Sequence, residues 1–88
     1  MKKKLTTAAC IGVLLGEGHI CEICPNTGKK SKYNVYTGLK ITYAGYITPK
    51  QFDELISAGL IESTHVHITN KYGIIYKFYR LSPNESED

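Results

Sequence analysis

Two short stretches of the sequence contain residue types that ligate transition metals. HICEIC contains Cys21 and Cys24, and HVH contains His65 and His67. A Cys-x-x-Cys and a His-x-His can together form a tetrahedral zinc site if the two segments meet. In an extended strand, however, side chains alternate between the two faces, so the two cysteines should point in opposite directions. We therefore expect no metal and no cofactor, and keep a zinc site of these four residues as the alternative.

No catalytic signature stands out in the sequence. It has no Gly-rich phosphate loop, no nucleophile elbow and no metalloprotease His pair. Asp53 and Glu54 are adjacent on a predicted helix, where their side chains point about 100° apart and face solvent. A redox role for Cys21 would require a helix N-terminus, but the residue falls in a predicted strand. We expect a protein that is not an enzyme.

The charge is distributed unevenly along the 88 residues. Residues 1–48 hold seven lysines against two glutamates, whereas residues 82–88 hold three acids and no base. The length suits one domain, predicted over residues 1–81, followed by a disordered acidic tail over residues 82–88. The basic domain suits an anionic partner. Ten of its eleven basic residues are lysines, so contacts to a nucleic-acid backbone are expected more than guanine reading by Arg.

The cysteine content and the N-terminus bear on location. Three cysteines with one close pair make a poor disulfide framework, which favours the reduced cytoplasm. MKKKLTTAAC begins like a secretory signal, but the apolar run before Cys10 is short, so we expect a first helix instead. No stretch is long enough to cross a bilayer, and no membrane partner is expected.

The apolar periodicity predicts the elements that must position any site. A helix is expected over residues 3–15, followed by a hairpin made of HICEIC and KYNVYT around the turn PNTGKK. A short extended piece, LKITYAGY, comes next. A second hairpin is expected from STHVHITNKYGIIYKFYRLS, with NKYG as its turn.

The stretch ITPKQFDELISAGLIES carries four signals for a helix. Thr48 is a good N-cap, Pro49 suits the first helical position, and Gln51 completes a capping box with Thr48. Phe52, Leu55 and Ile56 share one apolar face at i, i+3 and i+4, and Gly59 ends the helix. A capped helix that runs into a long hairpin is typical of a winged helix. The expected fold is therefore α+β, a single winged-helix-like domain with two helices and two β-hairpins.

The layout also resembles one family of small bacterial proteins, the topoisomerase-inhibiting toxins of toxin–antitoxin pairs. The resemblance covers about residues 5–81 and lies in LLGEGHI, NTGK, VYT, FDELISAGLIES and YKFYRLS. These are mostly fold-determining apolar and Gly positions, so the resemblance implies shared architecture more than a shared task. The family pattern lacks cysteines matching Cys21 and Cys24. Small phage and mobile-element proteins of this shape act as DNA-binding regulators or as inhibitors of host enzymes.

The first functional hypothesis is a small phage or mobile-element transcriptional regulator that binds duplex DNA, and a homodimer on a two-fold site is one form of this hypothesis. Lys50 and Gln51 begin the second helix, where recognition helices touch bases. Lys71 and Tyr72 occupy the wing tip. Lys29, Lys30 and Lys32 add a second basic turn that can contact phosphates.

The alternative hypothesis is an inhibitor, either a toxin or an anti-CRISPR-like anti-defence protein, that binds a host nucleic-acid enzyme. Seven tyrosines are many for so short a chain, and exposed Tyr is typical of protein interfaces. The predicted contact residues around the first hairpin are Tyr33, Tyr36, Tyr43 and Tyr46. Tyrosine also stacks on single-stranded bases, so these residues suit either partner.

Overall fold

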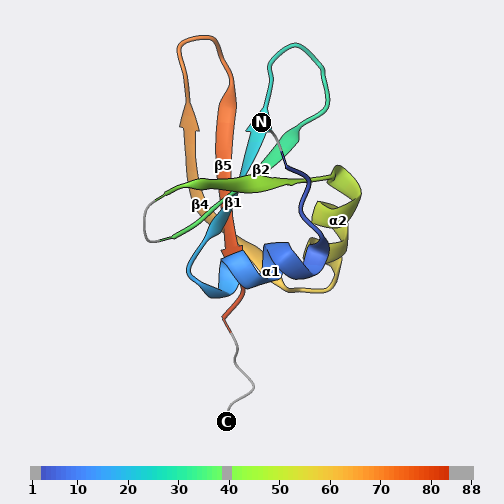
Figure 1. Ribbon diagram of the computed structural model, residues 1–88. Helices are drawn as coiled ribbons and strands as arrows, with labels where there is room; N and C mark the ends of the chain where they lie inside the picture. The colour runs from blue at the N-terminus through green and yellow to red at the C-terminus, as the bar shows by residue number, and fades with distance from the viewer. Residues whose placement is uncertain (1–2, 39–40, 84–88) are drawn as a thin grey trace.

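The computed structural model describes residues 3–38 and 41–83. Within those ranges the elements in chain order are α1 (Thr7–Leu15), β1 (His19–Cys24), β2 (Lys32–Tyr36), β3 (Tyr43–Ile47), α2 (Pro49–Ser57), β4 (Ile61–Thr69) and β5 (Ile75–Leu81). The predicted α+β class is confirmed, and both predicted hairpins, β1–β2 and β4–β5, are present (Figure 1). Residues 84–88, most of the tail predicted to be disordered, lie outside the described residues.

The sheet has the order β3-β2-β1-β5-β4, and every neighbouring pair is antiparallel. The extended piece predicted after the first hairpin becomes β3, which pairs with β2. Three strands therefore separate the two helices in sequence, and the helices pack on one five-stranded sheet. The winged-helix-like layout is not confirmed by this arrangement, in which most elements are strands.

The first helix begins four residues later than expected. Thr6 is its N-cap, and the Thr6 hydroxyl accepts a hydrogen bond from the Ala9 N–H at 3.0 Å. The preceding residues instead pair in parallel with β3, because Leu5 N donates to Tyr46 O at 2.8 Å. Gly45 permits this approach, since a Cβ there would lie 2.5 Å from the Lys3 carbonyl oxygen.

The second helix has the predicted N-terminus. Thr48 is the N-cap, Pro49 is the first helical residue, and both hydrogen bonds of the capping box with Gln51 are formed. The helix ends at Ser57, and Gly59 takes a φ of +71° two residues later. Phe52 and Leu55 are buried as predicted, but the prediction for Ile56 was wrong, because this side chain is 41% exposed. Local chemistry alone therefore specified this element, because its caps require no distant partner.

A single core lies between the two helices and one face of the sheet, here called the closed face. Ile20, Val35 and Cys10 have no exposed surface, and Leu55 is 1% exposed. Cross-strand partners share a face, so Ile20, Val35 and Tyr79 all belong to the closed face. Neither helix of the described part has the length and apolar character needed to cross a membrane.

The opposite side, here called the open face, carries no helix. Cys21 pairs with Asn34 on one side and Phe78 on the other, and Asn34 pairs with Tyr46. Repeating this register across the strands gives the residues of the open face: His19, Cys21, Ile23, Lys32, Asn34, Tyr36, Tyr46, Glu62, Ile68, Tyr76, Phe78 and Arg80. Tyr43 also reaches Tyr36, with ring centroids 5.8 Å apart, across an irregularity in the pairing of β2 and β3.

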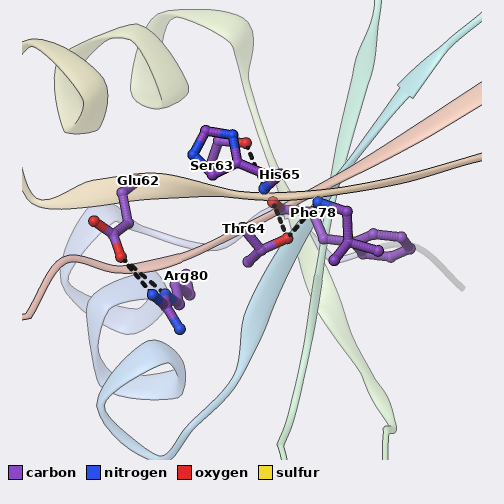
Figure 2. Close-up of polar contacts among 7 residues, drawn as sticks. Glu62, Ser63, Thr64, His65, Phe78 and Arg80 are labelled. Atoms are coloured by element: carbon purple, nitrogen blue, oxygen red, sulfur yellow. Dashed lines mark hydrogen bonds and ion pairs between the residues drawn. The ribbon is translucent and has the colours of Figure 1, made fainter.

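A wide bulge interrupts the outer strand β4. Ser63 pairs with Tyr79 and His67 with Lys77, so four steps along β4 match two steps along β5. His65 takes a φ of +63° there, and its N–H donates to the Ser63 hydroxyl at 3.0 Å (Figure 2). The Thr64 hydroxyl donates to the Phe78 carbonyl at 3.0 Å. These bonds satisfy groups of an edge strand locally, which disfavours extension of the sheet by another strand.

Candidate nucleic-acid interface

The two hairpin loops lie at the same end of the sheet, away from the helices (Figure 1). The side chain of Asn26, in the β1–β2 loop, donates a hydrogen bond to the Tyr72 carbonyl in the β4–β5 loop at 2.6 Å. A Cβ on Gly73 would lie 2.6 Å from the Asn26 amide nitrogen, so the contact requires glycine at that position. This contact holds two loops together that are more than forty residues apart in sequence.

The β4–β5 loop is well organised internally. The Asn70 side-chain oxygen accepts hydrogen bonds from the N–H groups of Tyr72, at 2.8 Å, and Ile74, at 3.0 Å. Asn70 N donates to Ile74 O at 2.9 Å and so closes the turn. Lys71 and Tyr72 are exposed at the tip, where the Lys71 ammonium lies 5.2 Å from the centre of the Tyr72 ring. The loop therefore presents one cation and one aromatic ring in a defined geometry.

The two joined loops and the first residue of β2 carry four of the lysines predicted to contact nucleic acid. These residues, here called the basic end, are Lys29, Lys30, Lys32 and Lys71, and all are exposed. In the part of the chain that the structure describes, the salt bridge found is Glu62–Arg80, so none of the four is neutralised by an ion pair. The basic end thus concentrates positive charge where the sequence showed only two separate lysine-bearing turns.

The start of α2 holds the other two residues predicted to contact DNA. Lys50 is exposed, but the Gln51 amide is engaged within the fold. Its oxygen accepts a hydrogen bond from the Thr48 N–H at 2.8 Å, and its nitrogen donates to the Leu5 carbonyl at 2.9 Å. The side chain that could have paired with adenine therefore connects α2 to the N-terminal segment.

The four tyrosines predicted for protein contact separate between the two faces. Tyr33 is a core residue, 9% exposed, and its ring stacks on Phe52 at a centroid distance of 4.2 Å. Tyr36 and Tyr46 lie half-buried on the open face, and Tyr43 reaches the same side. The structure thus brings three of the four together and places Tyr33 away from any partner on that side.

A pocket of about 330 Å³ lies where β2 begins and β3 ends, lined by residues 31–34 and 46–49. Lys32, Asn34 and Tyr46 are the residues of the open face among its lining. Asn34 is half-buried in this lining. Sequence reasoning missed Asn34, because only the β2–β3 register sets it opposite Tyr46.

A polar cluster on the closed face joins three strands. Glu22 accepts hydrogen bonds from the hydroxyls of Tyr33, at 3.3 Å, and Tyr79, at 3.0 Å. Burial and the bond to Glu22 raise the pKa of both hydroxyls to about 12, so they remain protonated donors at neutral pH. The Tyr33 ring stacks on Phe52 and the Tyr79 ring meets Phe52 edge-on, so the cluster ties β2 and β5 to α2 in the core.

The cysteines and histidines do not gather. The described residues hold no group of three or more metal-ligating side chains. Cys21 belongs to the open face, whereas Cys24 pairs with Ile75 and belongs to the other side. Burial raises the pKa of Cys21, with contributions from Cys24 and Glu22, and it raises the pKa of Cys10 to about 11. These thiols therefore stay protonated at neutral pH, which disfavours metal binding and nucleophilic attack.

Comparison of the chain with protein-family models, curated proteins and solved structures found no match. We therefore infer function from the placement of the side chains themselves.

Proposed function

We propose that the protein is a non-enzymatic nucleic-acid-binding protein that binds phosphates through its basic end. The observation that carries the proposal is the hydrogen bond from Asn26 to the Tyr72 carbonyl, because it unites lysines from two distant turns. Clustered, unpaired lysines displace condensed counterions from a nucleic acid, and this supplies most of non-specific binding. A phage or mobile-element regulator acting in the cytoplasm is the role such binding would serve. Three free thiols suit that reducing compartment.

In a winged-helix mode of binding, α2 would enter the major groove and the β4–β5 loop would be the wing. Exposed Lys50 can reach a phosphate, but Gln51 is held by Thr48 and Leu5, and Asp53 and Glu54 are exposed on the same helix. We therefore assign backbone contacts to Lys50 and Lys71, and assign no base reading to Gln51. Dimerisation on a two-fold site remains part of this hypothesis, and sedimentation of the complex tests it.

The test measures binding to labelled random duplex DNA by fluorescence anisotropy over a range of salt concentrations. We expect binding that weakens steeply with salt. The double variant Lys30→Ala/Lys71→Ala should lower the slope of log K against log salt by about 2. The matched control Lys3→Ala/Arg80→Ala removes the same charge outside the basic end, and should change the slope less. Absence of binding at low salt contradicts the proposal.

A second variant tests the joined geometry without changing the charge. Asn26→Ala removes the bond between the two loops and keeps every lysine. We expect affinity to fall by about 2- to 10-fold, the equivalent of one hydrogen bond, because the lysines are no longer held together. Unchanged affinity would show that the lysines act independently of one another.

The open face supports inhibition of a host nucleic-acid enzyme as a second candidate function. Half-buried Tyr36 and Tyr46 lie on this side, and Ile68 on β4 is 55% exposed. An apolar, aromatic sheet face of this kind suits a protein partner. In a supercoiling assay with a bacterial type II topoisomerase, the inhibitor should act without DNA affinity of its own. Tyr36→Ala should abolish inhibition, and Lys50→Ala should leave it intact.

A further inference from the structure

We infer that the pocket between the start of β2 and the end of β3 accepts an unpaired base of a single-stranded nucleic acid. This inference deepens the proposed function and rests on it, because the phosphates of the same strand would lie along the basic end. Three side chains of the pocket would contact the base and its phosphate: Lys32, Asn34 and Tyr46. The β2–β3 register places them on one face of the sheet.

The size of the pocket fits a small planar ligand. Its volume of about 330 Å³ lies at the lower end of the range for small-molecule sites. The lining comes from the ends of two paired strands, residues 31–34 and 46–49, so backbone hydrogen bonds hold its walls. A base in a duplex is stacked and paired and would have to be flipped out to enter. A single strand offers its bases without that cost.

The chemistry of the pocket matches a base and its phosphate. The Tyr46 ring provides a surface for stacking, which is tolerant of sequence because every base has a π-face. The Asn34 amide carries a donor and an acceptor side by side, the pattern that pairs with the N6 and N7 positions of adenine. Lys32 is the one charged residue among the eight that line the pocket, so the site favours an anion.

The positive charge continues on both sides of the pocket. Lys30 precedes Lys32 by two residues, so their Cα atoms are at most about 7.6 Å apart. On the other side, exposed Lys4 forms a parallel bridge with Tyr46. A single-stranded nucleic acid with one base in the pocket would therefore pass a lysine on each side of that base.

The experiment compares binding of single strands and of a duplex by fluorescence anisotropy. The probes are labelled oligo(dA) and oligo(dT) of about 16 nucleotides, the upper site size of one small single-strand-binding domain, and a duplex of equal length. We expect both single strands to bind more tightly than the duplex. Tyr46→Leu should weaken single-strand binding by about 5- to 100-fold, the measured range for loss of one stacked base, and spare duplex binding.

Conservative and matched variants separate stacking from folding. Tyr46→Phe keeps the ring and should retain single-strand affinity. Tyr43→Leu makes the same change in the same strand, outside the pocket, and should have a small effect. Asn34→Ala should reduce the preference for oligo(dA) over oligo(dT). Thermal melts of all four variants identify any loss of affinity that comes from unfolding, and Tyr46→Phe still tests the site if Tyr46→Leu unfolds.

The outcomes distinguish the two levels of the proposal. Equal affinity for single strands and duplex, with Tyr46→Leu and Asn34→Ala unchanged, overturns the base pocket. The proposed function then stands if Lys30→Ala/Lys71→Ala still weakens binding. No binding of any probe at low salt overturns both. Loss of single-strand binding in Tyr46→Leu, with rescue in Tyr46→Phe, supports the pocket.

Discussion

The two faces of the sheet are made by the same strands and differ in what covers them. On the closed face Ile20 and Val35 have no exposed surface, because α1 and α2 pack over them. On the open face Tyr36 and Tyr46 remain half-buried, with only neighbouring side chains around them. Tyr33 and Tyr36 are three residues apart in one strand and lie on opposite faces. The comparison shows that the alternation of side chains along a strand, more than residue type, decides whether a tyrosine packs in the core or stays partly exposed.

The largest change in the free energy of unfolding is expected at one of two tyrosines in β2. Tyr33→Ala removes the stacking on Phe52 and the bond to Glu22, so it should lower the free energy of unfolding by about 3 to 5 kcal/mol. Tyr36→Ala, on the open face, should cost about 1 kcal/mol. Urea denaturation measures both. Equal losses would mean that the open face also acts as a core.

Gln51 tests the assignment of α2 to the scaffold. Gln51→Ala removes half of the capping box and the bond to the Leu5 carbonyl, and should cost about 1 to 2 kcal/mol in urea denaturation. Lys50→Ala, its exposed neighbour, should change the free energy of unfolding little. If Gln51→Ala changes DNA sequence preference and leaves stability intact, α2 reads bases after all.

His19 makes the open face sensitive to pH. Burial against its neighbours lowers the pKa of His19 below its ordinary 6.5, and its ring stacks on Tyr36 at 5.5 Å. Because the unfolded chain then binds the proton more readily, this contribution to stability is complete above pH 6.5 and declines as the pH falls below it. His19→Phe should flatten the fall of stability as the pH drops below 6.5. A wild-type profile that rises on acidification would contradict the sign.

The smallest effect is expected at the salt bridge between Arg80 and Glu62, 2.9 Å long and largely exposed (Figure 2). Solvent screening leaves such pairs about 0 to 1 kcal/mol, so Arg80→Gln should change the free energy of unfolding by less than about 0.5 kcal/mol. The measurement is urea denaturation at low and high salt. A loss above 1 kcal/mol would show that the pair organises the end of the sheet.

The candidate site was predictable only in part. Lys29, Lys30 and Lys71 lie in turns as predicted, because Asn, Gly and Pro mark those turns locally. Lys32, predicted in the same turn, is instead the first residue of β2 and pairs with Ile23. That the two turns meet depends on the contact of Asn26 with Tyr72, between residues far apart in sequence. The pocket was not predicted, since Asn34 has no distinguishing local pattern.

The sequence by itself determined the elements whose signals are local. Thr48, Pro49 and Gln51 specify the start of α2 through bonds within one turn, and the hairpin turns follow from residues that favour them. Only the tertiary structure decided that residues 3–5 join β3 instead of α1, that Gln51 is engaged, and that Tyr33 and Tyr46 face opposite ways. The physical reason is that strand pairing joins distant segments, and a shift of one residue in register moves every side chain to the other face.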